Sequence, residues 1–149
     1  MIPISCDAVL NRDVRHWLQP RRSAMRSRLT ILVVYGSRHI AARIIHRLVR
    51  YPGVEIVGQA CEAGEAISLI SLRDPRLVIA DLSLSGGTGI DVLRKAKRMA
   101  IPPLVIMTSI SSFPQERREC IKNDADYFFH LPNEIVHLEE VIRQLTRSE

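Results

Sequence analysis

Asp81 is the residue whose type and position best suit chemistry, because this carboxylate closes a short apolar run, residues 76–81. Thr108 closes another apolar run, residues 104–108, and offers a hydroxyl. Carboxylate oxygens are ligands that hard cations prefer. In parallel α/β sheets, ligands and chemistry lie at the carboxyl ends of the strands. We therefore expect one site at this edge of the sheet, containing Asp81 and Thr108.

The elements that would position this site follow a regular alternation from residue 29 onward. Apolar runs predict five strands, and amphipathic or capped segments between them predict five helices. This alternation indicates an α/β class, with right-handed crossovers and a parallel sheet covered on both faces. Five such units predict a flavodoxin-like doubly wound (βα)5 fold with strand order 2-1-3-4-5. The predicted strands are 29–35, 54–60, 76–81, 104–108 and 125–129, and the predicted helices are 37–50, 62–72, 90–99, 113–122 and 132–145.

The 149-residue length indicates one domain, but the net charge of +5 is unevenly spread. Residues 1–28 contain six arginines and two aspartates, a local balance of +4, and the remainder is near neutral at +1. We predict a flexible basic arm over residues 1–28 and a folded domain over residues 29–149. Three unpatterned cysteines and no apolar run long enough to span a bilayer favour a cytoplasmic protein with no membrane contact.

The order of motifs resembles the receiver domain of bacterial response regulators. The segment LVIADLSLSGGTGIDVL (77–93) resembles the phosphoacceptor strand and loop, with Gly89 eight residues after Asp81. VEIVGQACEAGEAISLI (54–70) resembles the second strand and helix of nitrate-response-type receivers. VIMTS (105–109) and DADYFF (124–129) resemble the fourth and fifth strands of the family. The resemblance covers roughly residues 29–147.

The resemblance implies phosphoryl transfer from a histidine kinase onto Asp81, in two-component signalling. Mg²⁺ would be held by an acidic pair after the first strand, by Asp81 and by the Ser83 backbone carbonyl. Thr108 would bind the phosphoryl group, and Phe128 would be the aromatic residue that changes with the signalling state. The chain would be no enzyme beyond its own phosphorylation at Asp81.

Several family positions are nevertheless replaced. Tyr35 and Gly36 stand where two acidic residues are expected, and Leu131 stands where a lysine is expected. None of the three supplies the charge that the family uses. His130 carries a polar group, but the alternation of side chains along a strand turns it to the other face. We therefore predict a degenerate receiver with weak Mg²⁺ binding and inefficient phosphorylation.

The leading functional prediction is a signalling module that acts through protein contact. Its predicted surface comprises helix 113–122, strand 125–129 and the last helix, and it would serve a kinase, another signalling protein or a second copy. One alternative is a working but slow phosphoacceptor at Asp81. A second is an adaptor whose basic arm binds nucleic acid or membrane, although we expect nucleic acid not to be a partner. The turn Gly86-Gly87-Thr88-Gly89 lacks a phosphate-loop lysine, which disfavours a nucleotide-binding enzyme.

Overall fold

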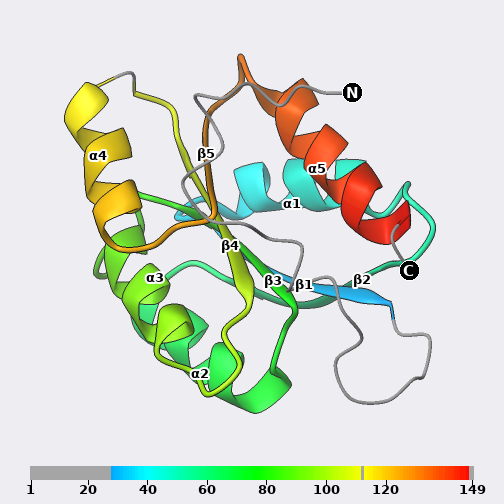
Figure 1. Ribbon diagram of the computed structural model, residues 1–149, viewed down its shortest axis with the longest axis horizontal. Helices are drawn as coiled ribbons and strands as arrows, with labels where there is room; N and C mark the ends of the chain where they lie inside the picture. The colour runs from blue at the N-terminus through cyan, green and yellow to red at the C-terminus, as the bar shows by residue number, and fades with distance from the viewer. Residues whose placement is uncertain (1–27, 112, 148–149) are drawn as a thin grey trace.

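A five-stranded parallel sheet lies at the centre of the computed structural model, which describes residues 28–111 and 113–147 (Figure 1). The strand order is β2-β1-β3-β4-β5. All four strand pairs are parallel, so the predicted fold class and topology are confirmed. The strands are β1 (Leu29–Val34), β2 (Val54–Ala60), β3 (Leu77–Asp81), β4 (Leu104–Ser109) and β5 (Tyr127–His130).

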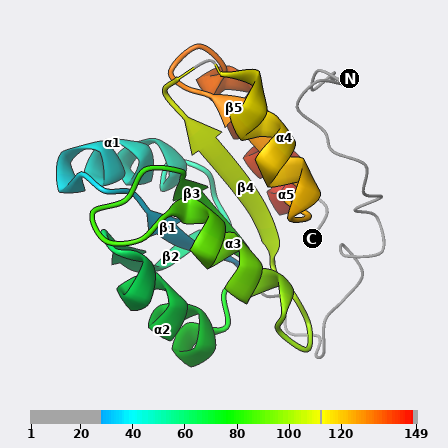
Figure 2. The same cartoon turned by 90° about the vertical axis from the view of Figure 1, so that its left-hand side faces the viewer.

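The helices divide between the two faces of the sheet because successive strand side chains point to opposite sides. One apolar cluster packs the first and last helices on one face, and a second cluster packs the other three on the opposite face. Figure 2 shows that second layer turned toward the viewer. The helices are α1 (Arg38–Leu48), α2 (Ala63–Arg73), α3 (Gly89–Lys97), α4 (Pro114–Lys122) and α5 (Ile135–Arg147).

Local chemistry sets the ends of these elements. The Ser37 side chain accepts a hydrogen bond from the Ile40 N–H and caps α1, as the sequence predicts. Strand β5 begins at Tyr127 rather than at residue 125, because the buried Asp126 carboxylate accepts the Val105 N–H at 2.9 Å. The apolar stripe along residues 40–48 predicts Ile40 on the same face as Ile44 and Leu48, but only the latter two are buried. Ile40 is 41% exposed.

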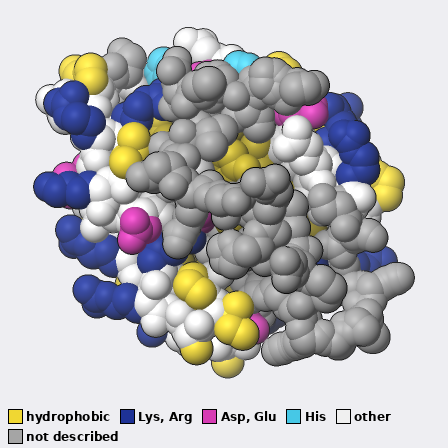
Figure 3. All heavy atoms as spheres, in the orientation of Figure 1, with side chains coloured by type: hydrophobic (Ala, Val, Ile, Leu, Met, Phe, Trp, Pro, Cys, Tyr) yellow, Lys and Arg dark blue, Asp and Glu magenta, His cyan; other side chains and the backbone are white. Residues whose placement is uncertain are grey.

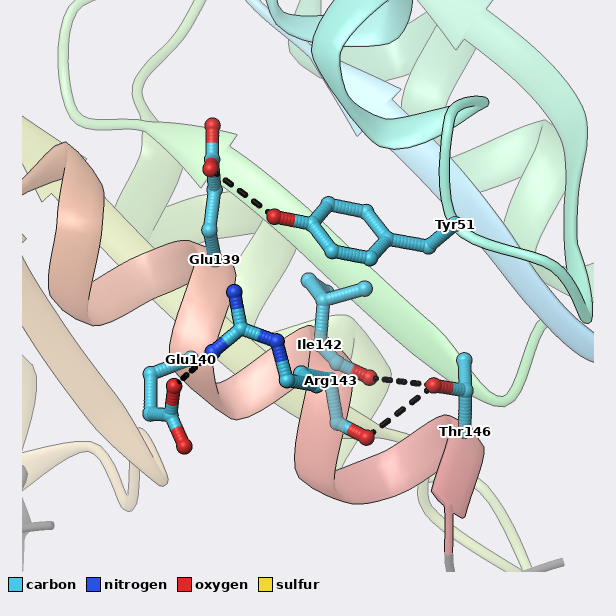
Figure 4. A network of polar contacts seen from close by, with 6 residues as sticks. All are labelled: Tyr51, Glu139, Glu140, Ile142, Arg143 and Thr146. Carbon is cyan, nitrogen blue, oxygen red and sulfur yellow. Dashed lines mark hydrogen bonds and ion pairs between the residues drawn. The ribbon is translucent and has the colours of Figure 1, made fainter.

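Polar contacts tie α1 and the turn after it to α5, and Figure 4 shows the contact of Tyr51 in that turn with α5. Glu139 accepts a hydrogen bond from the Tyr51 hydroxyl at 2.9 Å and pairs with Arg47. Arg143 lies over the Tyr51 ring at 5.8 Å and pairs with Glu140. These contacts hold the end of α1 and the turn after it against α5.

The sequence pattern of α3 predicts a solvated basic face formed by Arg94, Lys95, Lys97 and Arg98. Lysine and arginine side chains do gather over α3 and α4 along one edge of the molecule (Figure 3). However, the Lys97 ammonium lies 2.5 Å from the buried Asp126 carboxylate, and its side chain is only 11% exposed. Arg94 donates to Asn123 at 3.0 Å. Two of the four residues therefore hold α3 to neighbouring elements.

The basic arm predicted over residues 1–28 lies, apart from Arg28, outside the described residues. Within the part of the chain that the structure describes, no helix is both long and apolar enough to cross a membrane.

Candidate functional site

Four of the side chains selected from the sequence lie on one face of the sheet at the carboxyl ends of the strands. Asp81 pairs directly with Thr108 in the register of β3 and β4. Tyr35 follows β1, one residue beyond the last β1–β3 pair, which is Val34 with Ala80. Leu131 follows β5 on the same face, within the cluster beneath α1 and α5. The sheet therefore brings Tyr35, Asp81, Thr108 and Leu131 to one edge, as parallel topology requires.

A chain of hydrogen bonds joins three of these residues. The Thr108 hydroxyl donates to Oδ1 of Asp81 at 3.3 Å, and its oxygen lies 2.8 Å from the Tyr35 hydroxyl. A hydroxyl has a single proton to donate. Because that proton is directed at Asp81, Tyr35 must donate to Thr108. The chain therefore ends on the carboxylate, and both hydroxyl side chains are buried.

Burial is the main electrostatic influence on the Asp81 carboxyl and raises its pKa to about 6. Hydrogen bonds from Thr108 and from the Ser83 and Leu82 backbone act in the opposite direction, and the negative charge of Glu116 raises the pKa further. Burial also raises the pKa of the Tyr35 hydroxyl above its ordinary value. Tyr35 is therefore a neutral donor at physiological pH.

The turn after β3 packs closely against the end of that strand, at Asp81. A Cβ added to Gly89 would lie 2.2 Å from the Asp81 carbonyl oxygen, so no other residue fits there without moving the loop. Thr88 and Asp91 form a capping box that begins α3 at this point. The predicted turn is confirmed, and it serves to start a helix.

The donor set expected of a Mg²⁺ site is incomplete. Tyr35 directs its hydroxyl to Thr108, and Gly36 has no side chain. A Cβ at Gly36 would lie 3.1 Å from the Ser83 carbonyl oxygen, so the β3–α3 loop closes onto this position. The Ser85 hydroxyl donates to the Gly36 carbonyl at 3.3 Å across the same gap. No group of three or more His, Cys, Asp or Glu side chains suited to a metal occurs among residues 28–111 and 113–147. The residues present do not fit a metal site built from an acidic pair and Asp81.

The side chains around β5 follow the predicted alternation. Leu131 is buried on the α1 and α5 side, and Phe128 is buried on the opposite side beneath α4. The guanidinium of Arg117 lies 5.0 Å from the centre of the Phe128 ring. His130 lies away from Asp81, and its Nε2 is 3.1 Å from the Ile110 carbonyl oxygen. His130 therefore does not replace the missing lysine in this structure.

Glu116 was not selected from the sequence, although it lies near the site. Its Oε1 accepts hydrogen bonds from Ser109 at 2.6 Å and from Ser111 at 2.5 Å, and its charge acts on Asp81. The sequence offers one signal, because an acidic residue in the first turn of a helix commonly stabilises its N-terminus. That signal does not reveal that this turn approaches the end of β4.

Comparison with known proteins identifies the class to which this site belongs. The family model of the response regulator receiver domain matches residues 31–143. The chain belongs to this receiver family of two-component signalling.

Individual relatives agree with that assignment. The chain is 22% identical over 120 residues to the nitrate/nitrite response regulator protein NarL of Escherichia coli (strain K12), covering 80% of this chain and 56% of that protein. It is 38% identical over 64 residues to the transcriptional regulatory protein PdtaR of Mycobacterium tuberculosis (strain H37Rv), covering 43% of this chain and 31% of PdtaR. The chain thus spans about half the length of NarL and about a third of the length of PdtaR.

The solved structures show the same fold. The response regulator domain of Thermotoga maritima CheB superposes with a TM-score of 0.72 at 24% identity, over 80% of this chain and 97% of that domain. The receiver domain of a NarL response regulator from Mycobacterium tuberculosis gives a TM-score of 0.73 at 16% identity, over 83% of this chain and 99% of that domain.

Proposed function

We propose that this chain is a receiver module that signals mainly by protein contact, with phosphorylation of Asp81 weak or lost. The observation that carries the proposal is the hydrogen bond from Tyr35 to Thr108. In the family pattern, the Tyr35 position supplies a carboxylate to the metal, and Thr108 is free to bind a phosphoryl group. Here the two hydroxyls bind each other, which withdraws both from that chemistry.

Electrostatics support the same proposal. A phosphoryl group on Asp81 would bring about two negative charges into a half-buried site. Leu131 offers no cation to pair with them, and Glu116 adds a negative charge nearby. Mg²⁺ would supply the neutralising charge when bound, but its remaining protein ligands would be Asp81 and the Ser83 carbonyl. We infer weak Mg²⁺ affinity and phosphotransfer too weak for a phosphorylated form to accumulate.

The proposed contact surface comprises α4, β5 and α5. A groove of about 450 Å³ on this surface is lined by Phe113, Arg117, Phe128 and His130, among others. Phe113 is exposed, and Arg117 covers Phe128. An aromatic ring beside arginine is a combination enriched at binding hot spots. A histidine kinase, another signalling protein or a second copy of the chain would bind here.

We further propose that residues 29–149 are the functional unit, working in the cytoplasm, with residues 1–28 as a separate arm. The chain spans only part of its longer relatives, so the activities of those whole proteins are not assigned to it.

Phosphorylation by a small donor tests this proposal. The full chain is incubated with acetyl phosphate and Mg²⁺, and its intact mass is followed, with Asp81→Asn as the matched control. We expect no phosphorylated species in wild type beyond the level of the variant. A phosphorylated fraction that accumulates in wild type and is lost in Asp81→Asn would establish the slow phosphoacceptor instead.

A further inference from the structure

Exposed basic residues form two short rows, one on α3 and one on α4. Arg94 lies in the last turn of α3 and Arg98 is its C-cap, while Arg118 and Lys122 lie on α4. All four residues are exposed. Because residues i and i+4 share one face of a helix, the members of each row lie about 6 Å apart along the helix axis. We call these four residues the basic edge.

A hydrogen bond brings the two rows together. Nε of Arg94 donates to Oδ1 of Asn123 at 3.0 Å, and Asn123 is the C-cap of α4. Basic side chains accordingly follow one edge of the molecule across α4 and α3 (Figure 3). On its own, either row is typical of a solvated helix face. The fold joins the two rows into one charged surface, which no local sequence pattern indicates.

The carboxylates near the basic edge do not neutralise it. Residues 89–124 contain seven basic and four acidic residues. Asp91 is held in the capping box of α3, and Glu116 accepts hydrogen bonds from two serines. Glu119 accepts a hydrogen bond from a side-chain amide, and Asp124 follows α4. Within the part of the chain that the structure describes, no ion pair joins the basic edge to a carboxylate. The basic edge therefore presents positive charge to solvent.

An exposed aromatic ring lies at the start of the same surface. Phe113 is the N-cap of α4 and is 61% exposed. Phe113 and Arg118 line one hollow, and Arg118 and Lys122 line another of about 440 Å³. Because Arg118 belongs to both hollows, the ring and the cations of α4 form one continuous surface. Proteins that bind single-stranded nucleic acid combine cations along the strand with aromatic rings that stack on its bases.

We propose that the basic edge binds the phosphates of a single-stranded nucleic acid and that Phe113 stacks on one of its bases. Three of the four cations are arginines, whose planar guanidinium groups donate paired hydrogen bonds to phosphate oxygens. An extended strand can follow the cations from α4 to α3. This inference goes beyond the proposed function. It also replaces the expectation, drawn from the sequence alone, that nucleic acid is not a partner.

Other polyanions fit this surface less well. The bases of a duplex are paired and stacked, so they offer Phe113 no free base face. An acidic protein segment or an anionic membrane would neutralise the cations, but it would leave the exposed ring without a flat partner. The combination of cations and an exposed ring therefore favours unpaired bases.

The test measures binding of the full chain to labelled oligouridine and oligothymidine of about 12 nucleotides, by fluorescence anisotropy. One phosphate contact for each residue of the basic edge predicts that log K falls with log salt concentration with a slope of about −3. The double variant Arg98→Gln/Arg118→Gln should weaken binding by about tenfold or more and roughly halve this slope. Phe113→Ala should weaken binding by about fivefold or more and leave the slope unchanged.

Arg43→Gln/Arg50→Gln is the matched control, because it removes the same charge from exposed positions on α1 and just after it. It should change affinity by less than about twofold. No binding of either oligonucleotide, or an equal loss in the two double variants, would overturn the proposal. Tighter binding of a duplex of the same length, of a glutamate peptide of equal charge or of anionic vesicles would also overturn it. These readouts need neither Mg²⁺ nor phosphorylation, so they are independent of Asp81 chemistry.

Discussion

Tyr35 stands where a carboxylate is expected, and it also makes a hydrogen bond of its own at this site. Its hydroxyl donates to Thr108, which donates in turn to Asp81. A buried hydroxyl without a hydrogen-bond partner destabilises the fold. The three hydrogen-bonded residues therefore depend on one another to different degrees. The position of Thr108 in the middle makes it the residue on which the other two rely.

Replacement of the two hydroxyls should reveal this inequality. Tyr35→Phe removes one donor and leaves Thr108 bound to Asp81, so it should lower the free energy of unfolding by about 1 kcal/mol. Thr108→Val leaves the Tyr35 hydroxyl buried without a partner and should cost about 2–3 kcal/mol. Urea unfolding of both variants and of the double variant measures the difference. Equal costs for the two single changes would contradict the proposed dependence of Tyr35 and Asp81 on Thr108.

The raised pKa of Asp81 makes stability depend on pH. Because burial raises this pKa from 3.8 to about 6, the folded chain binds the proton more tightly than the unfolded chain. The resulting stabilisation is fully present below pH 3.8 and is lost as the pH rises through about 6. Asp81 therefore destabilises the fold when it is charged.

Asp81→Asn removes that charge and should raise the free energy of unfolding at pH 8 by about 1–2 kcal/mol, after allowance for solvent screening of a half-exposed group. The gain should shrink as the pH falls toward 4. Urea unfolding across this pH range measures it, with Glu55→Gln as a control for removal of an exposed carboxylate. The same gain for Asp81→Asn at both ends of the range would contradict the account.

At the scale of elements, α3 is anchored by a residue that its sequence pattern assigns to solvent. Lys97 donates to the Asp126 carboxylate and to the Pro103 carbonyl, at 2.5 and 2.9 Å. Asp126 also accepts the N–H of Val105. One ion pair thus links the end of α3 to the beginnings of β4 and β5.

Lys97→Met should therefore destabilise the fold by about 3 kcal/mol, since it leaves the Asp126 carboxylate buried without its cation. Lys95→Met, two residues earlier on the same helix, should change stability by no more than about 0.5 kcal/mol. Thermal or urea unfolding of the two variants compares them directly. A loss for Lys95→Met as large as for Lys97→Met would show that α3 depends on overall charge rather than on this pair.

At the scale of the whole molecule, the topology was predictable and the connections between side chains were not. Buried β-branched runs and capped helices predicted the order β2-β1-β3-β4-β5, because each element carries its own periodic signal. The placement of Asp81 beside Thr108 followed from that order. The bond between Tyr35 and Thr108 joins residues 73 positions apart in sequence, and no local pattern indicates it.

The whole fold thus retains the receiver frame while the edge that holds the chemistry has changed. Tyr35 and Gly36 stand where the family pattern has an acidic pair, the β3–α3 loop closes on Gly36, and Leu131 is buried beneath α1 and α5. In the function that we propose, these features all act on one step, the gathering of a metal and a phosphoryl group around Asp81. Weak Mg²⁺ binding is therefore the central claim of the proposed function.

A Mg²⁺ titration of the full chain tests that claim most directly, with backbone amide shifts of residues 81–83 and 108 as the readout and Asp81→Asn as the control. The account predicts no saturable change up to about 20 mM Mg²⁺, because one carboxylate and one carbonyl make a weak site. Saturable binding near or below about 1 mM that disappears in Asp81→Asn would contradict it, and would show that the altered site still gathers its metal.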